Sequence, residues 1–456
     1  MPRSISGSTG AVLRTMGGGS RWALLLSAAL LSACTCASDP PVASQRAGQT
    51  EGSRGAPSRC AIGSAQQTLH ASSEASAGDA TSDLFAIELG PAIVGEQGYW
   101  VPWLSGDGRK STAGLTALKP DLSASSSATL GIVHWDAAPP RVVALANDAV
   151  LAIVPDADAS GDSYRVARVQ GNEVTWGSEI DGGRDEASGF DVAATADGAL
   201  LVWDDFISER AMGAIVGASL DHEGHIRGGL RQFSPPASDA EAPRVAAHAG
   251  GYWLAWLSVS LQPAEEVTAS HSEPMAMRAT RRWIEVLRLD AAGQPQGEPI
   301  TASSPDAMVQ SFDLQAGHDG SALLSWREDF SNAGTSGGRV FVGRLTAGGD
   351  VERHAVDGEK FGGTLPTLLF DPRPPSGVPH AWLTLESAAG DSALAALSPM
   401  GRPLEVLGGG IGLGVASVLG ALNGQLLLAR PKGRDVVFLL ARCGYQPAAP
   451  RPDGGA

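Results

Sequence analysis

Short apolar runs, separated by pairs of turn-forming residues, recur along most of the chain. Three examples are "QGYWVPWLS" at 97, "DGALLVWDD" at 197 and "GGYWLAWLS" at 250, each with a Trp five residues after a Gly. Asn-Gly, Asp-Gly and Gly-Gly pairs between apolar runs are typical of β-hairpins, because Gly and Asn tolerate a positive φ. No stretch shows a long 3.6-residue period, so the pattern predicts short antiparallel strands.

The same pattern recurs in seven units of about 50 residues each. We place the anchor of each unit at Trp103, Val154, Trp203, Trp256, Trp326, Trp382 and Ala429. Each unit also carries a second hairpin, in which a Leu is followed by a Gly four residues later, as in Leu289 and Gly293. Each unit should therefore form four strands, and four-stranded units repeated around an axis make a β-propeller.

We predict an all-β fold, a seven-bladed β-propeller of four-stranded blades over residues 60–447. The anchor side chains should pack between neighbouring blades, because repeat units bury their apolar faces against each other. The seventh unit has only three strands before the chain ends. The stretch "CAIGSAQQTLHA", which starts at Cys60, can supply the fourth, so an N-terminal strand should close the ring in the last blade.

This closure would bring two of the four cysteines together. Cys443 ends the third strand of the last unit and Cys60 starts the predicted fourth strand. We therefore predict a Cys60–Cys443 disulfide, for which a chain-entropy model gives on the order of 5 kcal/mol as an upper figure. Pairing of Cys36 with either cysteine is the alternative. If the prediction holds, Cys36 is left over.

The N-terminus carries an export signal. Arg3, Arg14 and Arg21 precede the apolar run "WALLLSAALL" at 22–31, which is too short to span a bilayer but suits the core of a signal peptide. The run ends in "LSAC", residues Leu31 to Cys34, which resembles the lipobox of bacterial lipoproteins. An ordinary secretory signal is the alternative. Met16 would give a more typical signal length than Met1.

The lipobox resemblance implies that residues 1–33 are a signal peptide and that Cys34 carries the lipid. It also implies the cell envelope of a Gram-negative bacterium. Thr35 follows Cys34 where Asp favours retention in the inner membrane, so the resemblance points to the outer membrane. Several acyl chains on one Cys would anchor the chain stably. Residues 34–59, rich in Ser, Pro, Gly and Ala, are expected to be a disordered tether, and residues 448–456 a disordered tail.

The composition and the net charge limit the kinds of partner that the chain can bind. Hydrophobic residues make up 43% of the chain and charged residues 18%, so a large core can be buried. The net charge of −16 argues against nucleic acid and against docking on anionic lipid through charge. We expect a monomer without a cofactor, attached to the membrane only through its lipid.

Two short stretches raise the question of a metal ion. "LDHEGH", at 220–225, combines two His with two carboxylates, but Leu220 and Gly224 fit the second-hairpin pattern, so we interpret it as a turn. "DADASGDS", at 156–163, has the alternating oxygen spacing of a calcium loop but lacks the closing Glu, because Ala167 stands there. A plain loop is favoured, and the weak calcium candidates are Asp156, Asp158, Ser160 and Asp162.

The loops that follow the anchor strands of units three and five combine acids, Phe and Arg. They lie at the same end of a propeller as the long insertion at 258–281, and long loops on a regular scaffold often carry function. The candidate binding residues are Asp204, Asp205, Phe206, Glu209, Arg210, Arg327, Glu328, Asp329 and Phe330.

No nucleophile motif, phosphate-binding loop or CxxC pair accompanies these loops. We therefore expect a membrane-tethered lipoprotein whose propeller binds a protein or glycan partner, or acts as a scaffold for it. The alternative is a glycan hydrolase or lyase that uses the clustered acids, two of which would have to converge within about 5–10 Å.

Overall fold

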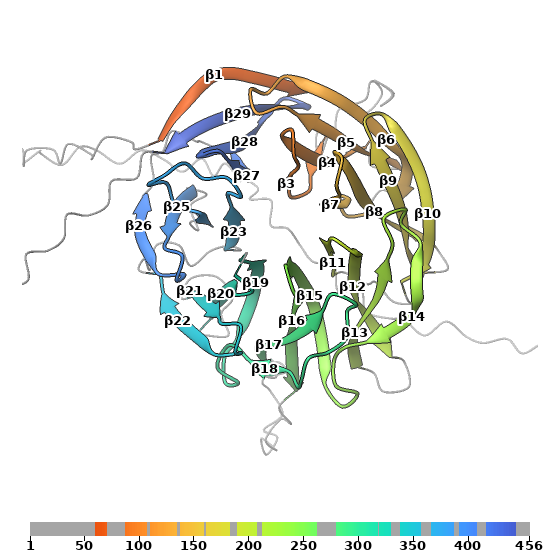
Figure 1. The fold of residues 1–456 in the computed structure, drawn as a ribbon, viewed down its shortest axis with the longest axis vertical. Helices are drawn as coiled ribbons and strands as arrows, with labels where there is room; N and C mark the ends of the chain where they lie inside the picture. The colour runs from red at the N-terminus through yellow and green to blue at the C-terminus, as the bar shows by residue number, and fades with distance from the viewer. Residues whose placement is uncertain are drawn as a thin grey trace, which may run out of the picture. The chain divides into compact units, whose positions relative to one another are not determined.

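The structure is a computed structural model. It describes residues 60–70, 87–106, 110–134, 137–158, 161–182, 189–207, 212–261, 280–317, 319–329, 338–356, 366–386, 392–407 and 416–443. These residues all lie in one unit, Pro57–Ala456, and every regular element among them is a β-strand. The strands form seven antiparallel sheets, which Figure 1 shows as blades around a central axis. The prediction of a seven-bladed all-β propeller is therefore confirmed.

In blades 2 to 6 the strands run in sequence order from the axis outwards, and in blade 1 both β2 and β3 pair with β4. Blade 1 contains β2 (Glu88–Leu89), β3 (Ile93–Val94), β4 (Tyr99–Gly106), β5 (Lys110–Leu118) and β6 (Ala124–His134). Blade 2 contains β7 (Arg141–Ala144), β8 (Ala149–Asp158), β9 (Gly161–Gln170) and β10 (Glu173–Asp181). Blade 3 contains β11 (Phe190–Thr195), β12 (Gly198–Ile207), β13 (Met212–Leu220) and β14 (Ile226–Gln232).

The other half of the ring repeats this arrangement. Blade 4 contains β15 (Asp239–His248), β16 (Gly251–Leu261), β17 (Thr280–Asp290) and β18 (Ile300–Thr301). Blade 5 contains β19 (Val309–Ala316), β20 (Ala322–Glu328), β21 (Arg339–Leu345) and β22 (Val351–Ala355). Blade 6 contains β23 (Thr367–Phe370), β24 (Ala381–Glu386), β25 (Ser392–Leu397) and β26 (Pro403–Leu407).

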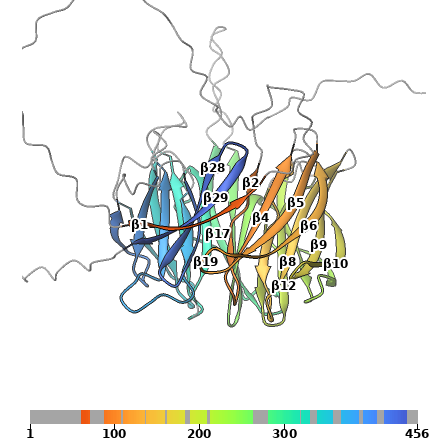
Figure 2. The same ribbon diagram turned by 90° about the horizontal axis from the view of Figure 1, so that it is seen from above.

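Blade 7 joins the two ends of the propeller. It contains β27 (Ser417–Leu422), β28 (Gln425–Lys432), β29 (Asp435–Cys443) and, outermost, the N-terminal strand β1 (Cys60–Leu69). Figure 2 shows β1 alongside β29, with Cys60 opposite Cys443 in the register. The two cysteines form a disulfide with a Cα–Cα distance of 3.9 Å. Both the predicted closing strand and the predicted disulfide are confirmed.

The described residues form seven apolar core clusters, each between two neighbouring blades. This follows from the alternation of side chains along each strand, which presents one row to the preceding blade and one to the next. Trp203, Trp256 and Trp326 are at most 1% exposed, as expected for anchors between blades.

The anchor positions predicted for the last two blades are wrong. Trp382 packs toward blade 7, and Ala429 toward blade 1, whereas Trp203 and Trp256 face the preceding blade. Leu385, three residues after Trp382, faces blade 5 and holds the anchor position in blade 6. The pattern allowed this error because a shift by an odd number of residues moves a side chain to the other face of a strand.

Candidate functional site

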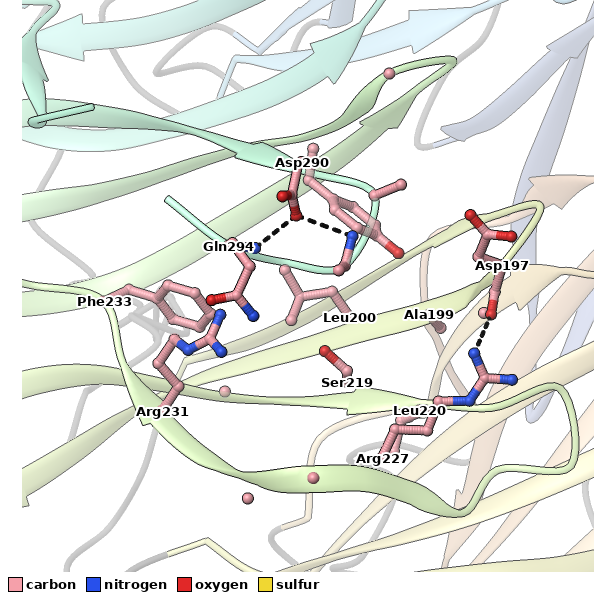
Figure 3. A pocket seen from close by; sticks show the side chains of 18 residues that line it. Asp197, Ala199, Leu200, Ser219, Leu220, Arg227, Arg231, Phe233, Asp290 and Gln294 are labelled. Carbon is pink, nitrogen blue, oxygen red and sulfur yellow. Dashed lines mark hydrogen bonds between the residues drawn. The ribbon is translucent and has the colours of Figure 1, made fainter. Parts of the chain in front are cut away.

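A cavity of about 770 Å³ lies between blades 3 and 4 (Figure 3). Its volume falls within the roughly 300–1,000 Å³ of ordinary ligand pockets. The hairpins β11–β12, β13–β14, β15–β16 and β17–β18 supply its walls. The polar side chains that line it are Asp197, Ser219, Arg227, Arg231, Tyr252, Asp290 and Gln294.

A bulge in β14 opens this cavity. Arg227 pairs with Ser219 and Arg231 pairs with Gly217, so three residues of β14 stand opposite one residue of β13. Gly228, in the bulge, has a φ of +80°, which favours glycine. Extra residues on one strand bend it and leave backbone groups unpaired, a device that is common beside functional sites.

Two arginines stand at opposite ends of the cavity, with Ser219 between them (Figure 3). Arg227 Nη1 donates to the carbonyl of Asp197 at 2.7 Å, and Arg231 Nη1 donates to the carbonyl of Gly293 at 2.5 Å. Each bond fixes the direction of a guanidinium group that carries five N–H donors. Most of those donors therefore remain available to a ligand.

The cavity also offers unpaired acceptors and hydroxyls. Among the described residues, the carboxylate of Asp197, the hydroxyl of Ser219 and the side-chain amide of Gln294 make no hydrogen bond or ion pair. The buried Tyr252 hydroxyl lies 3.2 Å from Thr195 Oγ1, and burial raises its pKa, so it stays protonated at neutral pH. The lining thus mixes hydrogen-bond donors and acceptors.

Of the acids predicted for blade 3, Asp204 accepts hydrogen bonds from the backbone. Asp204 Oδ1 accepts the N–H of Gly189 at 3.0 Å, and Asp204 Oδ2 accepts the N–H of Ala242 in blade 4, also at 3.0 Å. Asp205 is half-buried beside it and Phe206 is exposed. Glu209 and Arg210 lie outside the described residues.

The charges predicted for blade 5 are buried in local pairs. Arg327 Nη2 lies 2.9 Å from Asp329 Oδ1. Glu328 Oε1 accepts the indole N–H of Trp326 at 2.8 Å, and Glu328 Oε2 lies 3.0 Å from Arg353 Nη2. Phe330 and residues 262–279 of the long insertion lie outside the described residues.

The structure thus does not bring the predicted acids of blades 3 and 5 together. Blade 4 stands between the two groups, and the described acids for which contacts are known are engaged within or beside their own blade. Whether these loops bind a partner stays a prediction.

The interpretation of "LDHEGH" as a turn is confirmed, because it connects β13 to β14. Asp221 Oδ1 accepts the backbone N–H groups of Glu223 and His225, and Gly224 has a φ of +84°. In the part of the chain that the structure describes, no three His, Cys, Asp or Glu side chains are placed to hold a metal ion.

The weak calcium candidates occupy the β8–β9 hairpin. Asp156 lies 3.5 Å from Arg165 and accepts the N–H of His134 at 3.1 Å. The side chains of Asp158 and Asp162, and all of Ser160, lie outside the description. Calcium binding therefore stays untested.

The sequence pattern did not predict this cavity. Its signal is the stretch "IRGGLRQ" at 226–232, a Gly pair between two arginines inside a predicted strand. Glycine within a strand often marks a bulge or an approach to a ligand. The spacing along the chain does not show that Asp197 and Gln294 would face this stretch, since they come from other hairpins.

No protein-family model matches the chain, and no curated protein matches it. Similar solved structures include the polysaccharide lyase Uly1, with 9% identity over 78% of this chain and 90% of that chain, at a TM-score of 0.45. Another is the β-propeller domain of the Trilobed protease from Pyrococcus furiosus, with 11% identity over 82% and 100%, at a TM-score of 0.42. Acylaminoacyl peptidase from Pyrococcus horikoshii has 10% identity over 77% and 50%, also at 0.42. At these identities the likeness concerns the fold alone.

Two further observations bear on location. None of the described residues forms a helix that is long and apolar enough to cross a membrane. The Cys60–Cys443 disulfide is typical of a protein outside the cytoplasm, where thiols are not kept reduced.

Proposed function

We propose that the chain is a glycan-binding lipoprotein of the cell envelope, which binds its ligand in the cavity between blades 3 and 4. The observation that carries this proposal is the mixture of available donors and acceptors around the cavity, from Arg227, Arg231, Asp197, Ser219 and Gln294. A sugar presents many hydroxyls, each both donor and acceptor, so it can satisfy such a lining. A site built from polar groups discriminates strongly against ligands that leave those groups unpaired.

The cellular setting of the proposal comes from the sequence. A lipid on Cys34 and the tether at 34–59 would hold the propeller at the membrane, and Thr35 favours the outer membrane. The disulfide agrees with an exported protein. No cofactor and no nucleic-acid partner enters the proposal, and the propeller acts as a monomer.

Binding of envelope glycans to the purified protein tests the proposal. Peptidoglycan fragments and lipopolysaccharide core oligosaccharides are titrated calorimetrically into the wild type and into Arg231→Ala. Loss of hydrogen bonds from a charged group costs about 1.5–3 kcal/mol, so the variant should bind roughly 10- to 150-fold more weakly.

Arg288→Ala is the matched control. Arg288 Nη1 also donates to one backbone carbonyl, that of Ala347 at 2.7 Å, but Arg288 does not line the cavity. The control should bind like the wild type. Equal weakening in both variants, or no glycan bound by the wild type, would contradict the proposal.

A glycan hydrolase or lyase is the second candidate, and a pair of carboxyl groups favours it. Burial raises the pKa of Asp204, and burial together with the charge of Asp204 raises the pKa of Glu241. A raised pKa suits a general acid. Both groups already have partners, however, since Asp204 accepts two backbone N–H groups and Glu241 lies 2.9 Å from Arg282. Glycan cleavage that Asp204→Asn abolishes would favour the enzyme over the binding module.

A further inference from the structure

The two ends of the cavity between blades 3 and 4 carry different sets of charges (Figure 3). At one end Arg227 Nη1 donates to the carbonyl of Asp197 at 2.7 Å, so this end holds a carboxylate as well as a cation. At the other end Arg231 Nη1 donates to the carbonyl of Gly293 at 2.5 Å, and Arg231 forms no ion pair within the described residues. The two ends should therefore attract different chemical groups.

The acid in the turn that Arg231 contacts is engaged by that turn. Asp290 Oδ1 accepts the backbone N–H groups of Ala292 and Gln294 at 2.9 and 2.8 Å, and Gln296 Nε2 donates to Asp290 Oδ2 at 3.3 Å. Among the described residues Asp290 forms no ion pair. Its carboxylate is therefore directed toward its own turn, and the charge of Arg231 keeps no carboxylate partner.

A second set of donors faces Arg231. The side chain of Gln294 points toward Arg231 in Figure 3, and its amide makes no hydrogen bond in the part of the chain that the structure describes. A guanidinium fork together with an amide N–H matches the two oxygens of a carboxylate. The bond to Gly293 already orients the guanidinium group, so binding costs little further side-chain freedom.

Apolar side chains complete the lining. Phe233 and Leu200 are buried and line the same cavity as Arg231. Ligand pockets combine apolar walls of this kind with a few polar groups that fix the orientation of the ligand. The C–H face of a sugar ring can pack against such a wall while an acidic substituent of the ring reaches Arg231.

We propose that the cavity binds an acidic glycan and that Arg231 and Gln294 hold the carboxylate of one of its sugars. This inference rests on the proposed function, because it names the class of glycan. One cation and a neutral amide suit the single charge of a carboxylate better than the double charge of a phosphate monoester. The net charge of −16 gives no general attraction for an acidic glycan, so its recognition depends on this local cation.

Calorimetry on the full mature chain tests the proposal with trisaccharides of galacturonate, mannuronate and glucuronate, each as the free acid and as its methyl ester. The ester keeps every hydroxyl and loses only the charge. At least one free acid should bind the wild type roughly 10- to 150-fold more tightly than its ester, the range for hydrogen bonds to a charged group. This comparison uses the wild type alone, so it does not depend on the folding of a variant.

Two arginine variants then locate the carboxylate. Arg231→Gln should bind acid and ester equally, because it loses the charge that distinguishes them. Arg227→Gln is the matched control from the other end of the cavity, and it should weaken both ligands by the same factor and keep their ratio.

The outcomes separate this inference from the proposed function. Equal binding of acid and ester by the wild type would overturn the acidic class but leave glycan binding in place. Preference for a phosphorylated trisaccharide over every uronate would overturn the carboxylate. If the wild type binds no trisaccharide and none of the envelope glycans, both proposals fail. A preference for the acid that survives in Arg231→Gln would overturn the role of Arg231.

Discussion

In blades 3, 4 and 6, the residue after the Leu of the second hairpin organises the turn through its side chain. Asp221 Oδ1 accepts the N–H groups of Glu223 and His225 at 2.9 and 2.8 Å. Asp290 in blade 4 and Ser398 in blade 6 accept two backbone N–H groups in the same way. A side chain that accepts from the backbone two residues on is a common turn device. In these three blades the repeated Leu and Gly thus mark a turn that is held by local hydrogen bonds.

The acidity of Asp221 gives the first prediction. Burial opposes its charge, but the backbone N–H groups of His225 and Glu223 outweigh burial and lower its pKa. The charged form therefore stabilises the fold above the ordinary Asp pKa of about 4, and this contribution is lost as the pH falls through the lowered value. Asp221→Ala should lower the free energy of unfolding by about 1 kcal/mol at pH 7, and by less in acid.

Urea denaturation at several pH values measures this difference, with Ser398→Ala as the control. Ser398 caps the equivalent turn but does not titrate, so its variant should lose a similar amount at every pH in this range. A loss in Asp221→Ala that does not change with pH would count against the role of the charge.

Gly224 lies in the same turn, at a position where a side chain should destabilise the fold. Its φ is +84°, and a Cβ there would lie 2.8 Å from Val166 Cγ1 of blade 2. Gly224→Ala should therefore cost about 2–3 kcal/mol, from backbone strain together with the forced contact. Gly433 also has a positive φ, but nothing lies within 4 Å of its added Cβ, so Gly433→Ala should cost only about 1 kcal/mol. Equal losses in chemical denaturation would show that the contact with Val166 does not matter.

At the scale of elements, β1 is the least buried of the four strands of blade 7, the blade that closes the ring. Of its ten residues only Cys60 is buried, although β1 pairs with β29 over most of its length. Apolar packing therefore contributes little to holding this strand. Backbone hydrogen bonds and the disulfide to Cys443 must do most of it.

Removing the disulfide should accordingly destabilise the propeller. We expect the variant with Cys60→Ser and Cys443→Ser to lose about 2–5 kcal/mol of unfolding free energy, measured by denaturation. Cys36→Ser, which leaves the disulfide intact, serves as the control and should behave like the wild type. A double variant as stable as that control would mean that β1 holds its place without the bond.

The strands were more predictable than the site because their signals are local. Turn pairs and alternation located the blades and the closing strand, and even the pairing of Cys60 with Cys443 followed from counting strands. The anchor in blade 6 was misplaced because Trp occurs at two positions three residues apart, as in Trp253 and Trp256, which face different neighbours. The cavity could not be predicted, because its lining comes from four hairpins whose meeting depends on how two blades pack.

Across the whole molecule, none of the blades has a core of its own among the residues that the structure describes. Each of the seven apolar clusters needs side chains from two blades, so the ring is stable only when it is complete. Without β1, blade 7 would lose Cys60 from the cluster that it shares with blade 6, and Leu69 from the edge of the cluster that it shares with blade 1.

The lipobox resemblance predicts that a lipid on Cys34 attaches the whole molecule to the membrane. Metabolic labelling with a radioactive fatty acid should label the wild type, and Cys34→Ser should remove the label and release the protein from the membrane fraction. Cys36→Ser should keep both the label and the attachment. Label retained in Cys34→Ser would refute the resemblance to the lipobox.

The bond between Cys60 and Cys443 also changes the covalent connectivity of the folded chain from linear to circular. With a sequence separation of 383 residues, the disulfide makes nearly the whole folded region a covalent macrocycle. A protease that cuts one surface loop then opens the circle without dividing it, and every blade stays joined to the rest from one side or the other. For a protein outside the cytoplasm, where proteases act and thiols stay oxidised, one nick would leave a single molecule rather than two fragments.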